Sequence, residues 1–129
     1  MKLIILLARL LLGLVFVVFS INGLMMLYTG KGFIPMPPQP DDVGKEFTKI
    51  LFATGFLKVV KVIELTGGLF VLSGRFLNLG IFLLGPIVVN IFLYHLLMDK
   101  SGLPMGAALL GLTLFLAISD YKSWKAVLG

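Results

Sequence analysis

Four long apolar runs constrain the fold of this chain more than any other feature of its sequence. The first extends from residue 3 to residue 28 and contains one charged side chain, Arg9. A helix needs about 20 apolar residues to cross a bilayer. A secretory signal would have a shorter core and a cleavage site of small residues. We therefore expect a retained first span at 3–28 and further spans at 56–73, 77–98 and 103–119.

The composition supports a membrane protein. Hydrophobic residues make up 59% of the chain and charged residues 13%, whereas about a quarter of the residues in a soluble domain are charged. Four spans and their connections account for the 129 residues, which leaves no room for a soluble domain of ordinary size. The expected fold is all-α, an integral membrane four-helix bundle that forms a single membrane domain over residues 1–129.

The segment 29–54 separates the first two spans and has a different character. Four of the six residues from Pro35 to Pro40 are proline, which prevents a helix and favours extended chain. Asp42 is a suitable N-cap for a short helix in which Val43 and Phe47 share an apolar face. We expect this helix to be interfacial or re-entrant.

The formal net charge is +5, and the cations occur singly near the ends of segments instead of forming a basic face. This pattern favours membrane lipids as partners and argues against nucleic acid. The lysines and arginines show only a small excess on the side of the two termini. We expect a multi-pass protein of the cell (inner) membrane with both termini in the cytoplasm.

Several chemistries lack the residues that they need. The chain has no cysteine and one histidine, so it cannot supply thiolate ligands, or two imidazoles to a haem. It also lacks nucleotide-binding and hydrolase motifs. We expect no metal site and no intrinsic cofactor, and no catalytic residue can be assigned.

Glu64 is a carboxylate in the middle of the second span, with Lys61 three residues before it. A charge at this depth costs a few kcal/mol and needs a partner or a role. Arg9 lies about 9 Å along the first span and Glu64 about 13 Å from the end of the second, so antiparallel neighbours could bring them together. An Arg9–Glu64–Lys61 cluster would carry one excess positive charge, suited to an anionic or polar guest or a water. The alternative is an ion pair that only sets helix register.

Further polar side chains are expected at two levels of the bundle. Asn90 and Tyr94 share a face of the third span near the depth of Lys61 and would extend the pocket. An outer rim is expected beyond them, in which His95 and Asp99 form an i, i+4 cap. The remaining rim residues are Asn22 and Lys58.

Small residues mark the faces at which helices pack. Gly13, Ser20 and Gly23 share one stripe of the first span, where they would let another helix approach closely. Gly102 and Gly106 form a Gly-xxx-Gly pair at the fourth span, which favours packing within the bundle or a homo-oligomer.

Several motifs follow one another along nearly the whole chain. They are Arg9-Leu-Leu-Leu-Gly13 with Asn22-Gly23, Phe33-Ile-Pro-Met-Pro-Pro38, Lys61-Val-Ile-Glu64, Leu72-Ser-Gly74-Arg75, and Gly85-Pro-Ile-Val-Val-Asn90 followed by His95. Their order resembles the DoxX family of small four-span membrane proteins. The resemblance implies a four-helix membrane bundle and transfers no catalytic residue.

Some DoxX members are similar to a subunit of quinone-linked oxidoreductases, and others are linked to oxidative-stress complexes or receptor assembly. The resemblance therefore implies a membrane subunit, or a module that binds quinone or lipid, with a membrane or redox protein as partner. At most it would be a membrane subunit of an oxidoreductase, without catalysis of its own. Two alternatives stay open: a small proton-coupled transporter, which the lysine beside Glu64 disfavours, and an assembly factor without chemistry.

Overall fold

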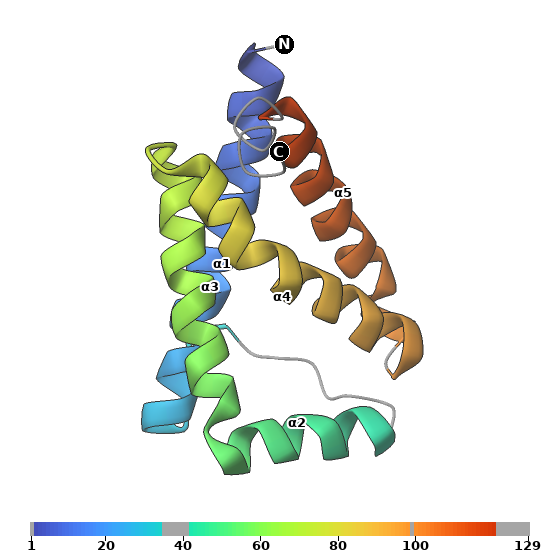
Figure 1. Ribbon diagram of the computed structural model, residues 1–129. Coiled ribbons are helices and arrows are strands. Elements are labelled where there is room, and N and C mark those ends of the chain that lie inside the picture. The colour runs from blue at the N-terminus through green and yellow to red at the C-terminus, as the bar shows by residue number, and fades with distance from the viewer. Residues whose placement is uncertain (1, 35–41, 99, 121–129) are drawn as a thin grey trace.

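The computed structural model describes residues 2–34, 42–98 and 100–120, which are almost entirely helical and include no strand (Figure 1). The prediction of an all-α fold is therefore confirmed. The chain order is α1 (Lys2–Thr29), α2 (Asp42–Thr54), α3 (Phe56–Ser73), α4 (Leu77–Leu97), the short 3₁₀ helix η1 (Lys100–Gly102) and α5 (Leu103–Ser119).

Three segments are long and apolar enough to cross a membrane: Lys2–Thr29, Leu77–Leu97 and Lys100–Ser119. This finding supports the prediction of a membrane protein. The helix α3 has 18 residues, but Lys58, Lys61 and Glu64 interrupt its apolar sequence. Large apolar side chains remain exposed on the outer faces, with Phe82 64% and Ile118 72% exposed, as expected for helices that contact acyl chains.

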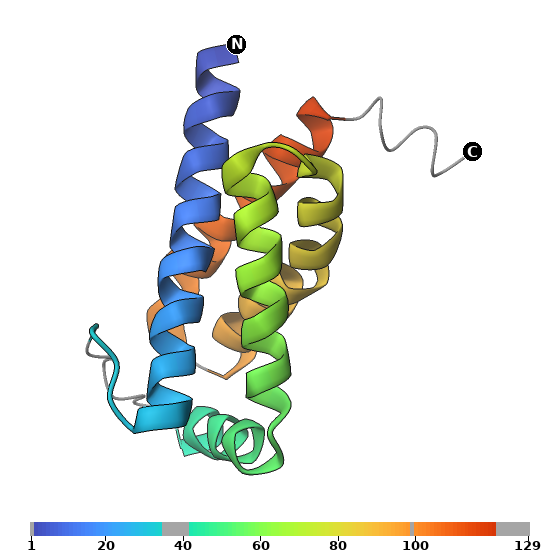
Figure 2. The ribbon, with the colours of Figure 1, turned by 90° about the vertical axis from the view of Figure 1, so that its left-hand side faces the viewer.

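The helices α1 and α3 lie side by side and antiparallel (Figures 1 and 2). Glycines allow this close contact. A Cβ atom on Gly13 would lie 2.8 Å from the backbone nitrogen of Leu72, and one on Gly68 would lie 3.1 Å from the Cβ of Phe16. The small-residue face predicted for the first span therefore packs on α3.

The core is formed where α4 and α5 pack against this pair of helices. Its fully buried members come from all four helices: Leu12, Val71, Leu84, Val88 and Leu116. On the α3–α4 side, Gly67 and Gly80 again allow the backbones to approach closely. In Figure 1, α4 begins beside α3 and diverges from it toward its C-terminal end.

The helix α2 crosses the end of the bundle at which α1 finishes (Figure 1). Phe47 of α2 stacks on Tyr94 of α4, with 5.7 Å between the ring centroids. Gly44 faces the same ring, because a Cβ there would lie 2.9 Å from the Tyr94 hydroxyl. The expected extended chain at residues 35–40 and the capping side chain of Asp42 lie outside the part of the chain that the structure describes.

Gly74 ends α3 in a left-handed conformation, with φ 74°, and its N–H donates to the Phe70 carbonyl. An L-residue in this conformation costs about 1–2 kcal/mol. A Cβ at this position would also lie 2.5 Å from the Cζ of Arg9. Gly74 is therefore required both by the turn and by the guanidinium beside it.

We predict that Gly74→Ala lowers the free energy of unfolding by at least about 1–2 kcal/mol, because it combines backbone strain with displacement of Arg9. Denaturation in detergent, followed by circular dichroism, measures the change. Gly85→Ala is the matched control, because an added Cβ there meets no atom within 4 Å. Equal stability of the two variants would contradict this role for Gly74.

Candidate site around Glu64

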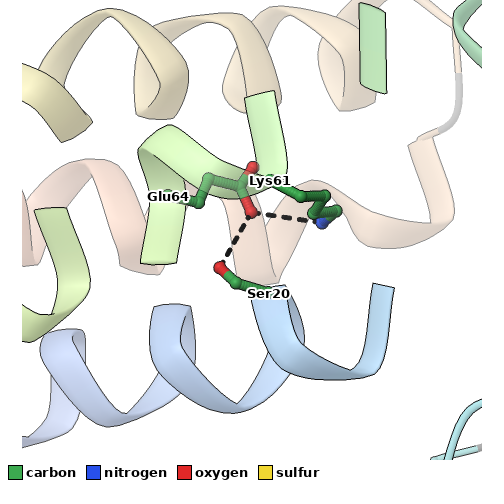
Figure 3. A network of polar contacts seen from close by, with 3 residues as sticks. All are labelled: Ser20, Lys61 and Glu64. Atoms are coloured by element: carbon green, nitrogen blue, oxygen red, sulfur yellow. Dashed lines mark hydrogen bonds and ion pairs between the residues drawn. The ribbon is translucent and has the colours of Figure 1, made fainter. Parts of the chain in front are cut away.

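Glu64 is buried in the contact between α1 and α3, with 4% of its surface exposed. One carboxylate oxygen, Oε2, accepts from the Lys61 Nζ at 3.1 Å and from the Ser20 hydroxyl at 3.4 Å (Figure 3). Lys61 precedes Glu64 by three residues, so both side chains lie on one face of α3. Ser20 reaches the same oxygen from α1.

The other carboxylate oxygen, Oε1, accepts no hydrogen bond from any described residue, because both contacts of Glu64 involve Oε2 (Figure 3). Buried charged groups in proteins normally have their hydrogen-bonding capacity satisfied. The Lys61 side chain is 20% exposed and makes one hydrogen bond to a described residue, although an ammonium group carries three N–H donors. A spare acceptor and spare donors therefore lie next to one another.

Gly23 creates the space for the lysine. A Cβ on Gly23 would lie 2.8 Å from the Lys61 Cε and 3.0 Å from its Cδ, so the aliphatic stem of Lys61 lies directly on the α1 backbone. Ser20 is fully buried one turn earlier. The small-residue stripe of α1 therefore does more than pack helices: it accommodates the lysine and supplies a hydroxyl to the carboxylate.

The structure corrects the expected position of Arg9, which forms no ion pair with Glu64. Its Nε donates to the Val71 carbonyl at 3.0 Å, and its guanidinium lies against Gly74. A cation here satisfies a free carbonyl in the last turn of α3 and complements the negative end of the helix dipole. The expected Arg9–Glu64 contact required the start of α1 and the end of α3 to lie at the same depth, and they do not. Ser20 lies opposite Glu64, 11 residues after Arg9, or about 16 Å along the helix.

Asn90 and Tyr94, the two expected pocket residues of α4, have separate environments. Asn90 is exposed and makes no hydrogen bond to any described residue. Tyr94 stacks on Phe47 and makes an edge contact with His95, with 5.1 Å between the centroids. The structure therefore joins Lys61 and Glu64 but does not bring Asn90 into hydrogen-bond contact with them.

The expected rim residues are held by distinct contacts. Asn22 is 1% exposed: its Nδ2 donates to the Ile34 carbonyl at 3.1 Å, and its Oδ1 accepts from the Ile34 N–H at 2.9 Å. Lys58 Nζ lies 5.0 Å from the centroid of the Tyr28 ring, in cation–π contact. These contacts bind the start of the loop and the first turn of α3 to the end of α1.

His95 lies against Gly102, so close that a Cβ on this glycine would overlap the imidazole ring. Its expected partner Asp99 lies outside the described residues.

Gly106 packs on Phe92 of α4, whereas Gly111 has open space around it. Within the described ranges, no three His, Asp or Glu side chains gather closely enough to hold a metal ion.

Comparison of the chain with protein-family models, with curated proteins and with solved structures gave no match. The functional proposal therefore depends on the geometry around Glu64 and on the family resemblance of the sequence.

We predict that Lys61→Met lowers the free energy of unfolding by about 1–3 kcal/mol, because it leaves a buried carboxylate with Ser20 as its single donor. The double variant Lys61→Met/Glu64→Leu should recover part of this loss, since removing both charges leaves neither unpaired. Denaturation in detergent measures the free energy of unfolding of the wild type, Lys61→Met and the double variant. Lys58→Met is the control, whose cation–π contact is worth about 0.5–1 kcal/mol. A double variant no more stable than Lys61→Met would contradict a coupled pair.

Proposed function

We propose that the chain is a DoxX-like multi-pass protein of the inner membrane that binds a hydrophobic molecule with a polar head, a quinone or a lipid, at Lys61 and Glu64. It serves as a membrane subunit or binding module of a redox or stress system and performs no catalysis of its own. The observation that carries this proposal is the buried Glu64 carboxylate, which has one oxygen without a hydrogen bond among the described residues.

In this proposal α3 crosses the membrane as a fourth span. This helix is antiparallel to α1, whose length and hydropathy suit a membrane crossing. Its charges need not face acyl chains, because Glu64 is buried and paired with Lys61. Lys58 is near the end of the helix and can extend toward the lipid headgroups. These features reduce the cost of placing α3 in the bilayer.

The helix α2 then lies at the membrane surface. It crosses the end of the bundle (Figure 1) and exposes Val43 and Ile50, by 60% and 59%, together with Lys45 and Lys49. Exposed apolar and basic side chains on one short helix are typical of helices that lie at the headgroup level. In this arrangement the start of α1 and the end of α5 lie on the opposite, cytoplasmic side (Figure 1).

Lys61 and Glu64 match the polar chemistry of such ligands. The lysine can donate to a quinone carbonyl or a lipid phosphate, and Glu64 Oε1 can accept from a quinol hydroxyl or a lipid headgroup. Hydrogen bonds to charged groups contribute about 1.5–3 kcal/mol each. One donor and one acceptor therefore suffice to orient the head of a ligand whose tail lies among the acyl chains.

The transporter alternative has less support. A proton carrier needs a carboxylate that exchanges its proton freely, whereas Glu64 is 3.1 Å from Lys61 Nζ in the bundle interior. An assembly factor would pack its client against the small residues of the last helix, Gly106 and Gly111. Gly106 is buried against α4, so only the Gly111 end of that face is open.

We predict that protein purified in mild detergent retains a quinone or phospholipid, detected by mass spectrometry of the extracted lipids. Lys61→Met and Glu64→Gln should each weaken retention by about 10- to 100-fold, because each removes a hydrogen bond to a charged group. Lys58→Met is the control, since it removes a lysine of the same helix that contacts Tyr28 instead of Glu64.

A melting curve for each variant establishes that it is folded before its lipid content is compared. Equal retention in the wild type, both site variants and the control would contradict the proposed site. A wild-type protein that carries no lipid or quinone above the detergent background would contradict it as well.

A further inference from the structure

Asn90 is a primary amide exposed on the outer face of α4, in the middle of a helix long and apolar enough to span a membrane. It makes no hydrogen bond to any described residue. Thr66, an exposed polar residue of α3, differs because its hydroxyl donates to the Val62 carbonyl at 2.9 Å within its own helix. Among acyl chains the Asn90 amide would leave its donors and its acceptor without partners, at a cost of several kcal/mol.

The residues around Asn90 form a regular stripe. Its members follow one another at intervals of four, three, four, three and four residues: Leu79, Leu83, Pro86, Asn90, Leu93 and Leu97. Leu79, Leu93 and Leu97 are 43%, 41% and 70% exposed. This interval is the a/d repeat by which two helices pack in a coiled coil. The stripe is about 27 Å long, close to the thickness of the hydrocarbon core.

The opposite face of α4 is already used within the chain. Gly80, Leu84 and Val88 are buried there against neighbouring helices. The stripe therefore faces away from the bundle core and can be covered only by something outside the described residues.

A second copy of this chain fits the stripe. With the single orientation proposed above, in which both termini are cytoplasmic, two α4 helices related by a twofold axis along the membrane normal run parallel. The two Asn90 side chains then meet, and because an amide carries both donors and an acceptor, each can satisfy the other. A single Asn in an apolar a/d repeat sets the register and oligomeric state of a parallel pair in this way.

We propose that the protein is a parallel homodimer in the membrane, joined along the α4 stripe with the two Asn90 amides hydrogen-bonded at its centre. The dimer depends on α4 crossing the membrane and not on a ligand at Glu64. Failure of one proposal therefore leaves the other standing.

Disulfide crosslinking maps the interface, because the chain contains no cysteine of its own. Single variants Leu79→Cys, Leu93→Cys and Leu97→Cys place a thiol on the stripe. The controls Phe82→Cys, Val89→Cys and Leu96→Cys place one elsewhere on the exposed surface of α4 (64%, 46% and 38% exposed). In phospholipid vesicles at a low protein-to-lipid ratio, we expect more crosslinked dimer from the stripe positions than from the controls. Equal crosslinking of the two sets, or none from either, would overturn the proposal.

Energy transfer between labelled copies, measured as lipid dilutes the protein, tests the amide itself. Asn90→Leu should weaken dimerisation by about tenfold, because that is the change in affinity expected when an interhelical hydrogen bond in a membrane is lost. Asn90→Gln keeps the amide and should retain most of the affinity, and Thr66→Val should leave it unchanged. A wild type that stays monomeric, or an Asn90→Leu variant that dimerises as well as the wild type, would contradict the account.

Discussion

The close contact between α1 and α3 is the interaction on which the rest of the structure depends. Glycines on both helices bring the backbones together, as Gly13 and Gly68 do on opposite sides of the interface. That proximity buries Glu64 and lets Ser20 reach it. It also places Arg9 at the end of α3, where the guanidinium satisfies a backbone carbonyl. One packing face therefore positions both the buried pair and the helix cap.

The ion pair of Lys61 and Glu64 contributes little to stability. Removing two charges from water costs several kcal/mol per ion, and their attraction repays this only when the remaining hydrogen-bonding capacity is satisfied. At Glu64 that condition is not met by the described residues, because Oε1 has no partner among them. A ligand headgroup at this oxygen would complete the pair, which connects the geometry to the proposed function.

The periodicity and length of the apolar runs predicted the helices closely, including both ends of α3 and α5. The i, i+3 spacing likewise predicted that Lys61 and Glu64 share a face. Depth alone could not identify Ser20 as the α1 residue that contacts Glu64. Because α1 extends beyond the end of α3, the residue opposite Glu64 lies about three turns further along α1 than Arg9. Matching the small residues of the two helices, with Gly23 opposite Lys61 and Phe16 opposite Gly68, places Ser20 opposite Glu64. The two hydrogen bonds between the Asn22 side chain and the Ile34 backbone had no comparable signal in the sequence.

The most direct test is a solid-state NMR measurement of the Lys61–Glu64 contact in lipid vesicles. The chain contains two glutamates, Glu46 and Glu64, so Glu46→Gln leaves Glu64 as the single glutamate reporter. With ¹³Cδ-glutamate and ¹⁵Nζ-lysine, the 3.1 Å N–O contact predicts strong dipolar dephasing that disappears in Lys61→Met. Absence of dephasing in the protein that retains Lys61 would show that the carboxylate and the ammonium are apart, and would contradict the account.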